Sequence, residues 1–509
     1  MMLTLLTFLP LAGVALMLIF MRGRPSAYKT AALVTSVFEA ALAIFLTIRF
    51  DTAQSGFQFV EKHVWIKSLG ISYHLGVDGI SLILILLTTL LTAIAILGTW
   101  NSITDRTLAF FVSLLVLETG MVGVFASLDM FLFYVFWEVQ LVPMYFIIGL
   151  WGGPKRVYAA IKFFLYTFAG SVLMLVAMLA VVWWYAKHGG PVTFDILELQ
   201  KAGFQGSLAL WAFAAFFIAF AIKVPMFPVH TWLPDAHTEA PTAGSVILAG
   251  VLLKMGVYGM IRFCIGFFPE VAVKAIVPVM ILSAIAVIYG AAMSLVQPDL
   301  KRLVAYSSVS HMGFVTAGLF AFNQQGIEGS VLQMVNHGVL TGALFLMVGY
   351  FYDRMHTRMI KDYGGLASPM PVAAGLFSLF VLGSLGLPGL NGFVGEFLIM
   401  VGVFQYAKVF AALVAVGIVL SAGYLLWMYQ RTMFQKTPER WLSLKDLGAR
   451  EIIAVAPLVI LAVWIGIFPG PFLDLLHVPA QTIMAQVQPY LAEHGGSLVG
   501  AFALFFGGF

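Results

Sequence analysis

Apolar stretches of membrane-spanning length recur along the whole chain and limit what it can fold into. A helix needs about 20 mainly apolar residues to cross the hydrocarbon core of a bilayer. Of the 509 residues, 61% are hydrophobic and 10% are charged, whereas about a quarter are charged in soluble domains. The sequence therefore predicts an all-α polytopic membrane protein and excludes a soluble globule.

Apolar stretches bounded by charges or turn residues predict about fourteen transmembrane helices. We expect them at 3–21, 29–49, 77–99, 107–126, 129–151, 158–185, 207–229, 241–264, 273–296, 300–321, 327–351, 370–405, 407–430 and 451–469. The seventh contains Pro225 and Pro228, and the twelfth contains Pro388. Because proline removes a backbone donor and clashes with the preceding turn, both are predicted to be broken helices.

The two predicted breaks lie five spans apart, which indicates two copies of one five-helix unit. An odd number of helices makes the copies inverted, as in many transporters. The predicted parts are an N-terminal three-helix segment at 1–106, a first repeat at 107–264, a second inverted repeat at 273–432, and a C-terminal helix with an amphipathic tail at 433–509. The final stretch, 497–509, is too short to be predicted as a span.

The distribution of charge predicts orientation, and the single cysteine limits chemistry. Loops on one side of the predicted map carry twice as many Lys and Arg as those on the other, which favours external termini by the positive-inside rule. No basic, aromatic-interleaved patch points to nucleic acid. Cys264 alone excludes a disulfide, a four-cysteine iron–sulfur cluster and a cysteine zinc site on this chain. We expect no cofactor here.

Two lysines lie within predicted spans, where charge is costly. Lys254 is deep in one span, and Lys223 ends another just before a proline-rich break. A lysine at the centre of a membrane helix costs at least about 2.5–3.5 kcal/mol and is a functional-site hypothesis by default. Because a low-dielectric environment disfavours the ammonium charge, such lysines gain and release protons readily. The pattern indicates proton movement.

Glu138 is the deepest carboxyl group in the predicted spans. We expect it to pair with Lys223, because the separation of two such groups adjusts the proton affinity of each. The alternative is a static salt bridge that only joins two helices.

Lys254 has no evident partner in its own helix, so its proton must move through water or neighbouring side chains. His311 and His337 are the expected relay, since imidazole passes a proton between its two ring nitrogens. Glu396, eight residues past the proline of the twelfth span, is the expected far end. The alternative for each of the three is a structural hydrogen-bonding role.

Glu118 is a possible accessory to Glu138, and Glu39 is interpreted as structural or interfacial. The run 230–241 superficially resembles a metal site, with His230, Asp235, His237 and Glu239. It lacks the H-E-x-x-H helix of metalloproteases, and its prolines suit a loop that re-enters the membrane. No metal site is predicted.

Four segments together resemble the antiporter-like membrane subunits of respiratory complex I, the proton-pumping NADH:quinone oxidoreductase. They are WEVQLVPMYFIIGLWGG, KVPMFPVHTWLPDAHTEAPTAGSVILAGVLLKMG, DLKRLVAYSSVSHMGF and GLPGLNGFVGEF. The resemblance covers spans four to thirteen and implies fourteen core helices with two inverted repeats. At the position of Glu396, the M-type branch of this family (chain M or chain 4) carries glutamate, whereas the L, N and sodium-antiporter types usually carry lysine. The chain therefore resembles the M-type branch.

The resemblance implies a role for each candidate residue. These roles are Glu138 and Lys223 as a modulating pair, Lys254 as the central proton carrier, Glu396 as the terminal donor, and His311 and His337 as the bridge. It also implies a non-redox subunit of the bacterial plasma membrane, with homologous L- and N-type chains as partners. The alternatives are a subunit of a multi-component cation/proton antiporter, and a scaffold that only holds its neighbours.

Overall fold

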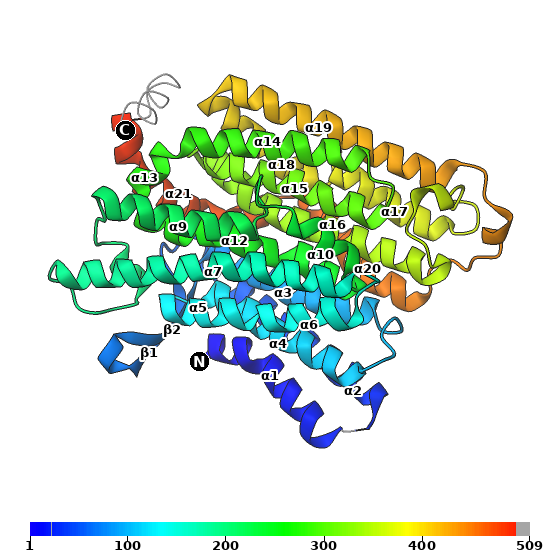
Figure 1. The fold of residues 1–509 in the computed structure, drawn as a ribbon, viewed down its shortest axis with the longest axis horizontal. Coiled ribbons are helices and arrows are strands. Elements are labelled where there is room, and N and C mark those ends of the chain that lie inside the picture. Colours follow the sequence, from blue (N-terminus) through cyan, green and yellow to red (C-terminus); the bar gives the residue numbers. More distant parts are fainter. Residues whose placement is uncertain (22, 495–509) are drawn as a thin grey trace.

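The computed structural model describes residues 1–21 and 23–494, and the predicted short stretch at 497–509 lies outside them. Nearly all described elements are helices that run roughly parallel to one axis (Figure 1). Twelve of these helices are long and apolar enough to cross a membrane. The all-helical polytopic class predicted from the sequence is confirmed by this pattern.

The N-terminal part contains three long helices and one β-hairpin. Its elements are α1 (Met2–Phe20), α2 (Pro25–Arg49), β1 (Gln58–Ile66), β2 (Ile71–Val77) and α3 (Gly79–Gly98). The strands pair antiparallel, with Glu61 opposite Leu75 and Val64 opposite Ser72. The sequence analysis did not predict this hairpin. We call the end of the bundle that carries it the hairpin end.

The next part crosses the bundle five times. Its helices are α4 (Thr107–Ala126), α5 (Met130–Val139), α6 (Leu141–Trp151), α7 (Arg156–Lys187), the short α8 (Ile196–Leu199), α9 (Gly206–Lys223), α10 (Trp232–Glu239), α11 (Thr242–Ile247) and α12 (Leu253–Gly259). Two π-helical segments, η2 (Leu248–Leu252) and η3 (Met260–Ile265), flank α12 within one continuous helix.

The following part has a similar sequence of elements. After the short α13 (Pro269–Lys274) come α14 (Ile276–Leu295), α15 (Leu300–Leu319), α16 (Gln324–Met355), α17 (Pro371–Ser384), α18 (Asn391–Tyr406) and α19 (Lys408–Tyr429), which ends in the π-helical η5 (Gln430–Phe434). α7 and α16, which make the third crossing of the bundle in each part, are both 32 residues long. The fourth crossing is interrupted in both parts, between α9 and α10 and between α17 and α18.

Two helices complete the described chain. α20 (Ala449–Ile467) crosses the bundle, and α21 (Gly470–His494) packs against α3, α13 and α16 at the hairpin end. A Cβ on Gly79 would collide with the carbonyl of Leu475, so the start of α3 and the backbone of α21 are in direct contact. The N-terminus and the end of α21 lie at the hairpin end (Figure 1).

The sequence explains where many of the helices start and how the interrupted ones are tolerated. Asp78, Asp129 and Asp299 each accept a hydrogen bond from a backbone N–H in the first turn of the helix that follows, as good N-cap residues do. Pro225 and Pro228 lie between α9 and α10, where the Trp232 side chain donates to the free carbonyl of Ile222 at 2.8 Å.

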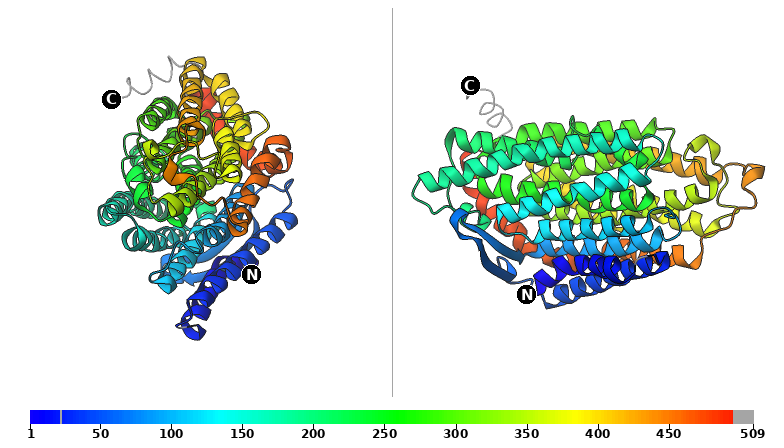
Figure 2. Two further views of the ribbon diagram at one scale, coloured as in Figure 1. Left: turned by 90° about the vertical axis from the view of Figure 1, so that its right-hand side faces the viewer. Right: turned by 60° about the horizontal axis from the view of Figure 1, so that its bottom comes forward.

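Helices with apolar surfaces surround a core that holds the polar residues. The membrane-spanning windows of Thr242–Ile265 and Gln324–Met355 are wholly buried inside the chain's own fold, whereas only a third of the windows of α1 and α20 is buried. Viewed along the helix axes, the first helices and α19 lie at opposite edges (Figure 2). Lys254 and His337 lie on these two interior helices.

Candidate functional site

Lys254 lies at the centre of the buried helix formed by α11, η2, α12 and η3, and it is fully buried. Its ammonium group donates to the carbonyl of Ala249 and lies 2.7 Å from Nδ1 of His337. Ala249 belongs to the π-helical turn η2, and such turns frequently occur at functional sites. Among the described residues the lysine thus has no carboxylate contact, and its side-chain partner is a histidine.

Two histidines and a carboxyl group continue from Lys254. The rings of His337 and His311 are 5.9 Å apart between centroids. Nδ1 of His311 then lies 3.1 Å from Oε1 of Glu396. All four residues are at most 4% exposed. The structure therefore brings the predicted relay residues together in a single buried row.

Close packing of helices positions the far end of this row. Glu396 is on α18, one turn after the interruption at 385–390 that contains Pro388. A Cβ on Gly395 would lie 2.9 Å from Nδ2 of Asn336 and 3.0 Å from Cβ of Gln333, so α18 and α16 meet closely here. Gln333 donates to Oε1 of Glu396 at 3.2 Å. This carboxyl group is held by one histidine and one amide.

Lys223 and Glu138 lie near each other but do not touch. Lys223 is 1% exposed, and its Nζ has no hydrogen-bond partner among the described residues. It lies over the rings of Trp137, at 5.2 Å, and Phe163, at 5.8 Å. Glu138 is half-buried, and its charge acts on Lys223 without an ion pair within 4.0 Å in the described part of the chain. The structure does not show the static salt bridge considered above.

Glu118 belongs to a different cluster from Glu138. It accepts a hydrogen bond from Ser36 at 2.9 Å and faces the equally buried Glu39 of α2. Neither oxygen of Glu39 has a hydrogen-bond partner among the described residues. Glu118 and Glu39 therefore lie as neighbouring buried carboxyl groups at the interface of α2 and α4, without a hydrogen bond between them.

The four polar residues of 230–241 point to separate partners. Asp235 lies 2.7 Å from Nζ of Lys162, and Glu239 accepts from the backbone N–H of Lys155 at 2.8 Å. His237 stacks on Phe345, and His230 stacks on Phe227. Within residues 1–21 and 23–494, no cluster of three or more His, Cys, Asp or Glu could hold a metal ion.

Several buried polar residues near this site were not identified from the sequence. Lys301, near the start of the predicted span 300–321, was not singled out, but it is 6% exposed and donates to the carbonyl of Ala240. Arg262, near the end of the predicted span 241–264, was not singled out either, and it lies within η3 and pairs with Asp78. Gln333 could have been found, because it lies one helical turn before His337 and so shares its face.

Comparison with known proteins agrees with this geometry. Residues 127–421 match the family described as NADH:quinone oxidoreductase/Mrp antiporter, TM. The chain is 46% identical to NADH-quinone oxidoreductase subunit M of Rhodobacter capsulatus, over 97% of this chain and 98% of that protein. It is 43% identical to NADH-ubiquinone oxidoreductase chain 4 of Marchantia polymorpha, over 94% and 96%.

Solved structures show the same fold. A chain of respiratory complex I from Thermus thermophilus with bound NADH superposes with a TM-score of 0.88 at 32% identity, covering 96% of this chain and 100% of that one. A chain of the Mrp complex from Dietzia sp. gives a TM-score of 0.85 at 19% identity, covering 96% and 98%, which shows a common fold.

The fold and the buried row of lysine, histidine and glutamate define an antiporter-like, polytopic membrane subunit. The sequence identity to subunit M and chain 4 proteins, which extends over nearly the whole chain, then shows to which branch of this family the chain belongs. The chain belongs to the subunit M, or chain 4, family of NADH:quinone oxidoreductase, respiratory complex I.

Proposed function

We propose that this chain translocates protons along the buried row Lys254, His337, His311 and Glu396, coupled to quinone reduction elsewhere in the complex. The observation that carries the proposal is the close succession of these groups, with 2.7 Å between Lys254 and His337 and 3.1 Å between His311 and Glu396. Each group can bind and release a proton, and the row lies in the interior, away from lipid. The redox cofactors belong to other subunits.

Lys223 and Glu138 would set the direction of transfer. When Glu138 moves away from Lys223, the Lys223 proton loses a stabilising negative charge and moves on toward Lys254. When the two approach, the proton is held. The absence of a direct contact supports an adjustable pair, because the distance between the two charges is free to change in either direction.

The proposed architecture is fourteen transmembrane helices with two inverted five-helix repeats. The matching order of elements supports it, since the third crossing of each part has 32 residues and the fourth is interrupted. The repeats are 107–264 and 273–432, between an N-terminal segment at 1–106 and a C-terminal part at 433–509. An odd number of helices reverses the orientation of the second copy.

The proposed location is the bacterial inner membrane, with the hairpin end external. In that position the opposite end, with the loops rich in Lys and Arg, faces the interior of the cell. Homologous L- and N-type chains would be the lateral partners, and water and protons would fill the row.

Replacement of Lys254 by methionine tests the function. In membrane vesicles that contain the assembled complex, Lys254→Met is expected to reduce NADH-driven proton pumping at least about tenfold, because the central carrier is lost. Lys408→Met, at an exposed lysine, is the matched control.

Two outcomes would contradict the proposal. Undiminished pumping by the assembled Lys254→Met complex would leave only a scaffold role. Proton flux driven by a sodium gradient without NADH oxidation would favour the cation/proton antiporter alternative.

A further inference from the structure

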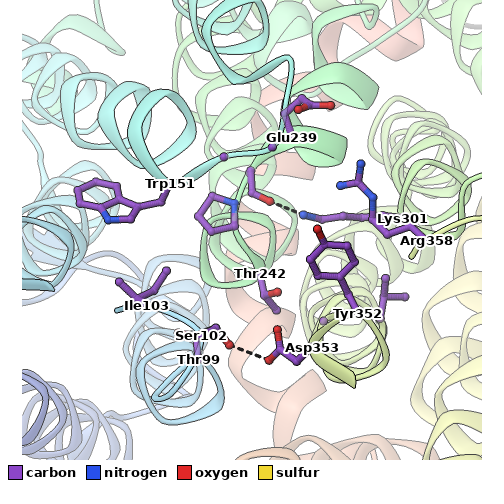
Figure 3. A pocket seen from close by; sticks show the side chains of 16 residues that line it. Thr99, Ser102, Ile103, Trp151, Glu239, Thr242, Lys301, Tyr352, Asp353 and Arg358 are labelled. Carbon is purple, nitrogen blue, oxygen red and sulfur yellow. Dashed lines mark hydrogen bonds between the residues drawn. The ribbon is translucent and has the colours of Figure 1, made fainter. Parts of the chain in front are cut away.

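Two recesses in the described part of the chain have opposite chemistry. A cavity between the two proposed repeats, at the end of the bundle opposite the hairpin, has a volume of about 190 Å³. Charged side chains of both signs lie in its wall (Figure 3), namely Glu239, Lys301, Asp353 and Arg358. Such a wall retains water, because charged groups are costly to remove from it. The second recess is an apolar groove at the hairpin end, and its lining points to a hydrocarbon ligand.

The groove lies between α9, in the first proposed repeat, and α14, the first long helix of the second. Its volume is about 640 Å³, within the range of about 300–1,000 Å³ that is usual for sites that bind small molecules. Residues three or four apart share one face of a helix. Each helix turns such a face to the groove, with Ala209, Phe213 and Phe217 from α9 and Pro278, Val279 and Leu282 from α14.

The groove opens on the surface that faces lipid. α9 packs against α7 and α12, and α14 packs against α15 and α19, so the two helices face each other across the groove. Leu210 and Ile218 in its wall, and Ile281 and Ile285 on α14, are exposed apolar side chains. In helices of membrane-spanning length, such side chains lie in the hydrocarbon core. Hydrocarbon from the bilayer therefore has direct access to the groove.

The length of the groove matches one acyl chain. It begins beside Gly206, the first residue of α9, and reaches Ile218. The helix rises about 18 Å between these two residues at 1.5 Å per residue. One leaflet contributes half of a hydrocarbon core that is about 30 Å thick. The groove therefore runs from the membrane surface at the hairpin end to about the middle of the bilayer.

An ion pair lies at the mouth of the groove. Lys274, the last residue of α13, donates to Oε1 of Glu270 at 2.6 Å, and both residues line the groove. Their side chains are 42% and 31% exposed. An ammonium group has three donors and a carboxylate has two acceptor oxygens, so each can bind a second group of opposite charge. The mouth thus presents one positive and one negative group side by side.

We propose that the groove binds one acyl chain of a phospholipid whose headgroup combines a phosphate with a primary ammonium, as in phosphatidylethanolamine. The phosphate accepts a hydrogen bond from Lys274, and the headgroup ammonium donates to Glu270. A trimethylated ammonium, as in phosphatidylcholine, has no N–H to donate. A headgroup without an ammonium, as in phosphatidylglycerol, leaves the Glu270 carboxylate beside a phosphate. The bound chain joins the two proposed repeats across this face.

Photolabelling of the assembled complex tests the proposal. The complex is placed in lipid nanodiscs with a trace of phospholipid that carries a diazirine in one acyl chain and one of the three headgroups. Labelled peptides are then identified by mass spectrometry. Labelling of 206–218 and 275–282 by the ethanolamine lipid is expected to exceed labelling by the choline and glycerol lipids at least about threefold, the size of effect that partly exposed charge pairs have.

Two substitutions separate the headgroup from the acyl chain. Glu270→Gln removes the negative group, so the ethanolamine lipid should lose its advantage over the choline lipid. Ala214→Phe fills the groove, so labelling by all three lipids should fall. Ala412→Phe is the matched control for the second, since Ala412 is exposed on α19 and does not line this groove. Because Glu270 is partly exposed, Glu270→Gln remains a test even if Ala214→Phe prevents assembly.

Four outcomes would contradict the proposal. Equal labelling by the three lipids would mean that the groove holds bulk lipid without selection. Stronger labelling by the glycerol lipid would assign the mouth to an anionic headgroup. Absence of labelling would mean that a neighbouring subunit covers this face. An unchanged preference for the ethanolamine lipid in Glu270→Gln would exclude the contact with the headgroup ammonium.

Discussion

The buried lysines of this chain differ in what surrounds the ammonium group. Lys254 contacts His337, Lys301 donates to the carbonyl of Ala240, and Lys223 lies over aromatic rings without a hydrogen-bond partner in the described structure. The most weakly held of the three is therefore Lys223, whose charge is opposed only by Glu138 at a distance. These contacts support the transfer role proposed for Lys254 and the control role proposed for Lys223.

A prediction at this scale concerns Asp195, in the loop between α7 and α9. Burial alone would raise the pKa of Asp195, but hydrogen bonds from His74 and Lys62 and their charges hold that pKa well below its usual range. The stabilisation is fully present above the unfolded pKa of about 3.9 and is lost as the pH falls toward the lower folded pKa. Asp195→Asn is expected to weaken the attachment of the β1–β2 hairpin by about 1–2 kcal/mol.

Hydrogen exchange of residues 58–77 at several pH values checks this. The wild-type hairpin should lose protection as the pH falls below about 4, while Asp195→Asn should exchange faster at neutral pH and respond less to acid. Equal protection of both proteins at neutral pH would contradict the assigned contacts.

Residues such as Lys301 and Arg262 show why part of the site could not be predicted from the sequence. Both lie near the end of a predicted span, where long charged side chains commonly extend to the membrane surface, so their burial could not be predicted from the sequence. The row from Lys254 to Glu396 was predictable because its members interrupt long apolar runs. The distance between Glu138 and Lys223 could not be predicted from the sequence, because it depends on how α5 and α9 pack relative to each other.

At the scale of elements, the interrupted helices were predictable and the hairpin only in part. The two breaks fall where a proline is accompanied by a second proline or by glycines, at 225–228 and 386–389, whereas the single prolines Pro10 and Pro457 lie inside continuous helices. Strand β2 is largely buried, and its alternating Ile71, Tyr73, Leu75 and Val77 are a local strand pattern that could have been recognised. Strand β1 is mostly exposed and has no matching pattern, and its place depends on contacts with α1 and with the loop at 193–196.

The contact between α12 and α9 gives a prediction at this scale. A Cβ on Gly256 would lie 2.7 Å from Cγ2 of Val224 and 2.8 Å from the carbonyl oxygen of Phe220. Gly256→Ala is therefore expected to force the helices apart, costing about 1–3 kcal/mol, and to slow pumping because Lys223 and Lys254 flank the contact. Thermal inactivation and NADH-driven pumping of the assembled complex measure the two effects.

Gly423→Ala is the control for this substitution. Gly423 lies in α19, and no atom is within 4 Å of a Cβ built on it. Alanine there should leave pumping unchanged and stabilise the helix by about 0.5–1 kcal/mol. If the Gly256→Ala complex matched the Gly423→Ala complex in both thermal inactivation and pumping, close packing of α12 against α9 at Gly256 would not be required.

At the scale of the whole molecule, the fold places polar clusters in its interior and at two ends. The hairpin end holds the Asp195 cluster and the Arg262–Asp78 pair, and the opposite end holds the cavity with Lys301. The row between Lys254 and Glu396 lies across the bundle between these ends. This row joins a residue of the first proposed repeat, Lys254, to three residues of the second.

Side-specific labelling tests the proposed orientation of the molecule. In a Cys264→Ser background, Ser68→Cys near the hairpin and Ser443→Cys in the loop before α20 are both exposed positions. A membrane-impermeant maleimide is expected to label Ser68→Cys from outside intact spheroplasts and Ser443→Cys only in inverted vesicles. The reversed pattern would invert the topology and contradict the assignment of the cavity to the inner side.

The complete burial of two membrane-spanning helices has a consequence for how the chain is made. The segment 242–265 is synthesised before 324–355. In the finished fold the two segments pack against each other, and the spanning window of each is wholly buried by the rest of the chain. A segment with a central lysine is costly to leave in lipid. Biogenesis must therefore include a late step in which 242–265 leaves the lipid for the interior, after α16 has been inserted.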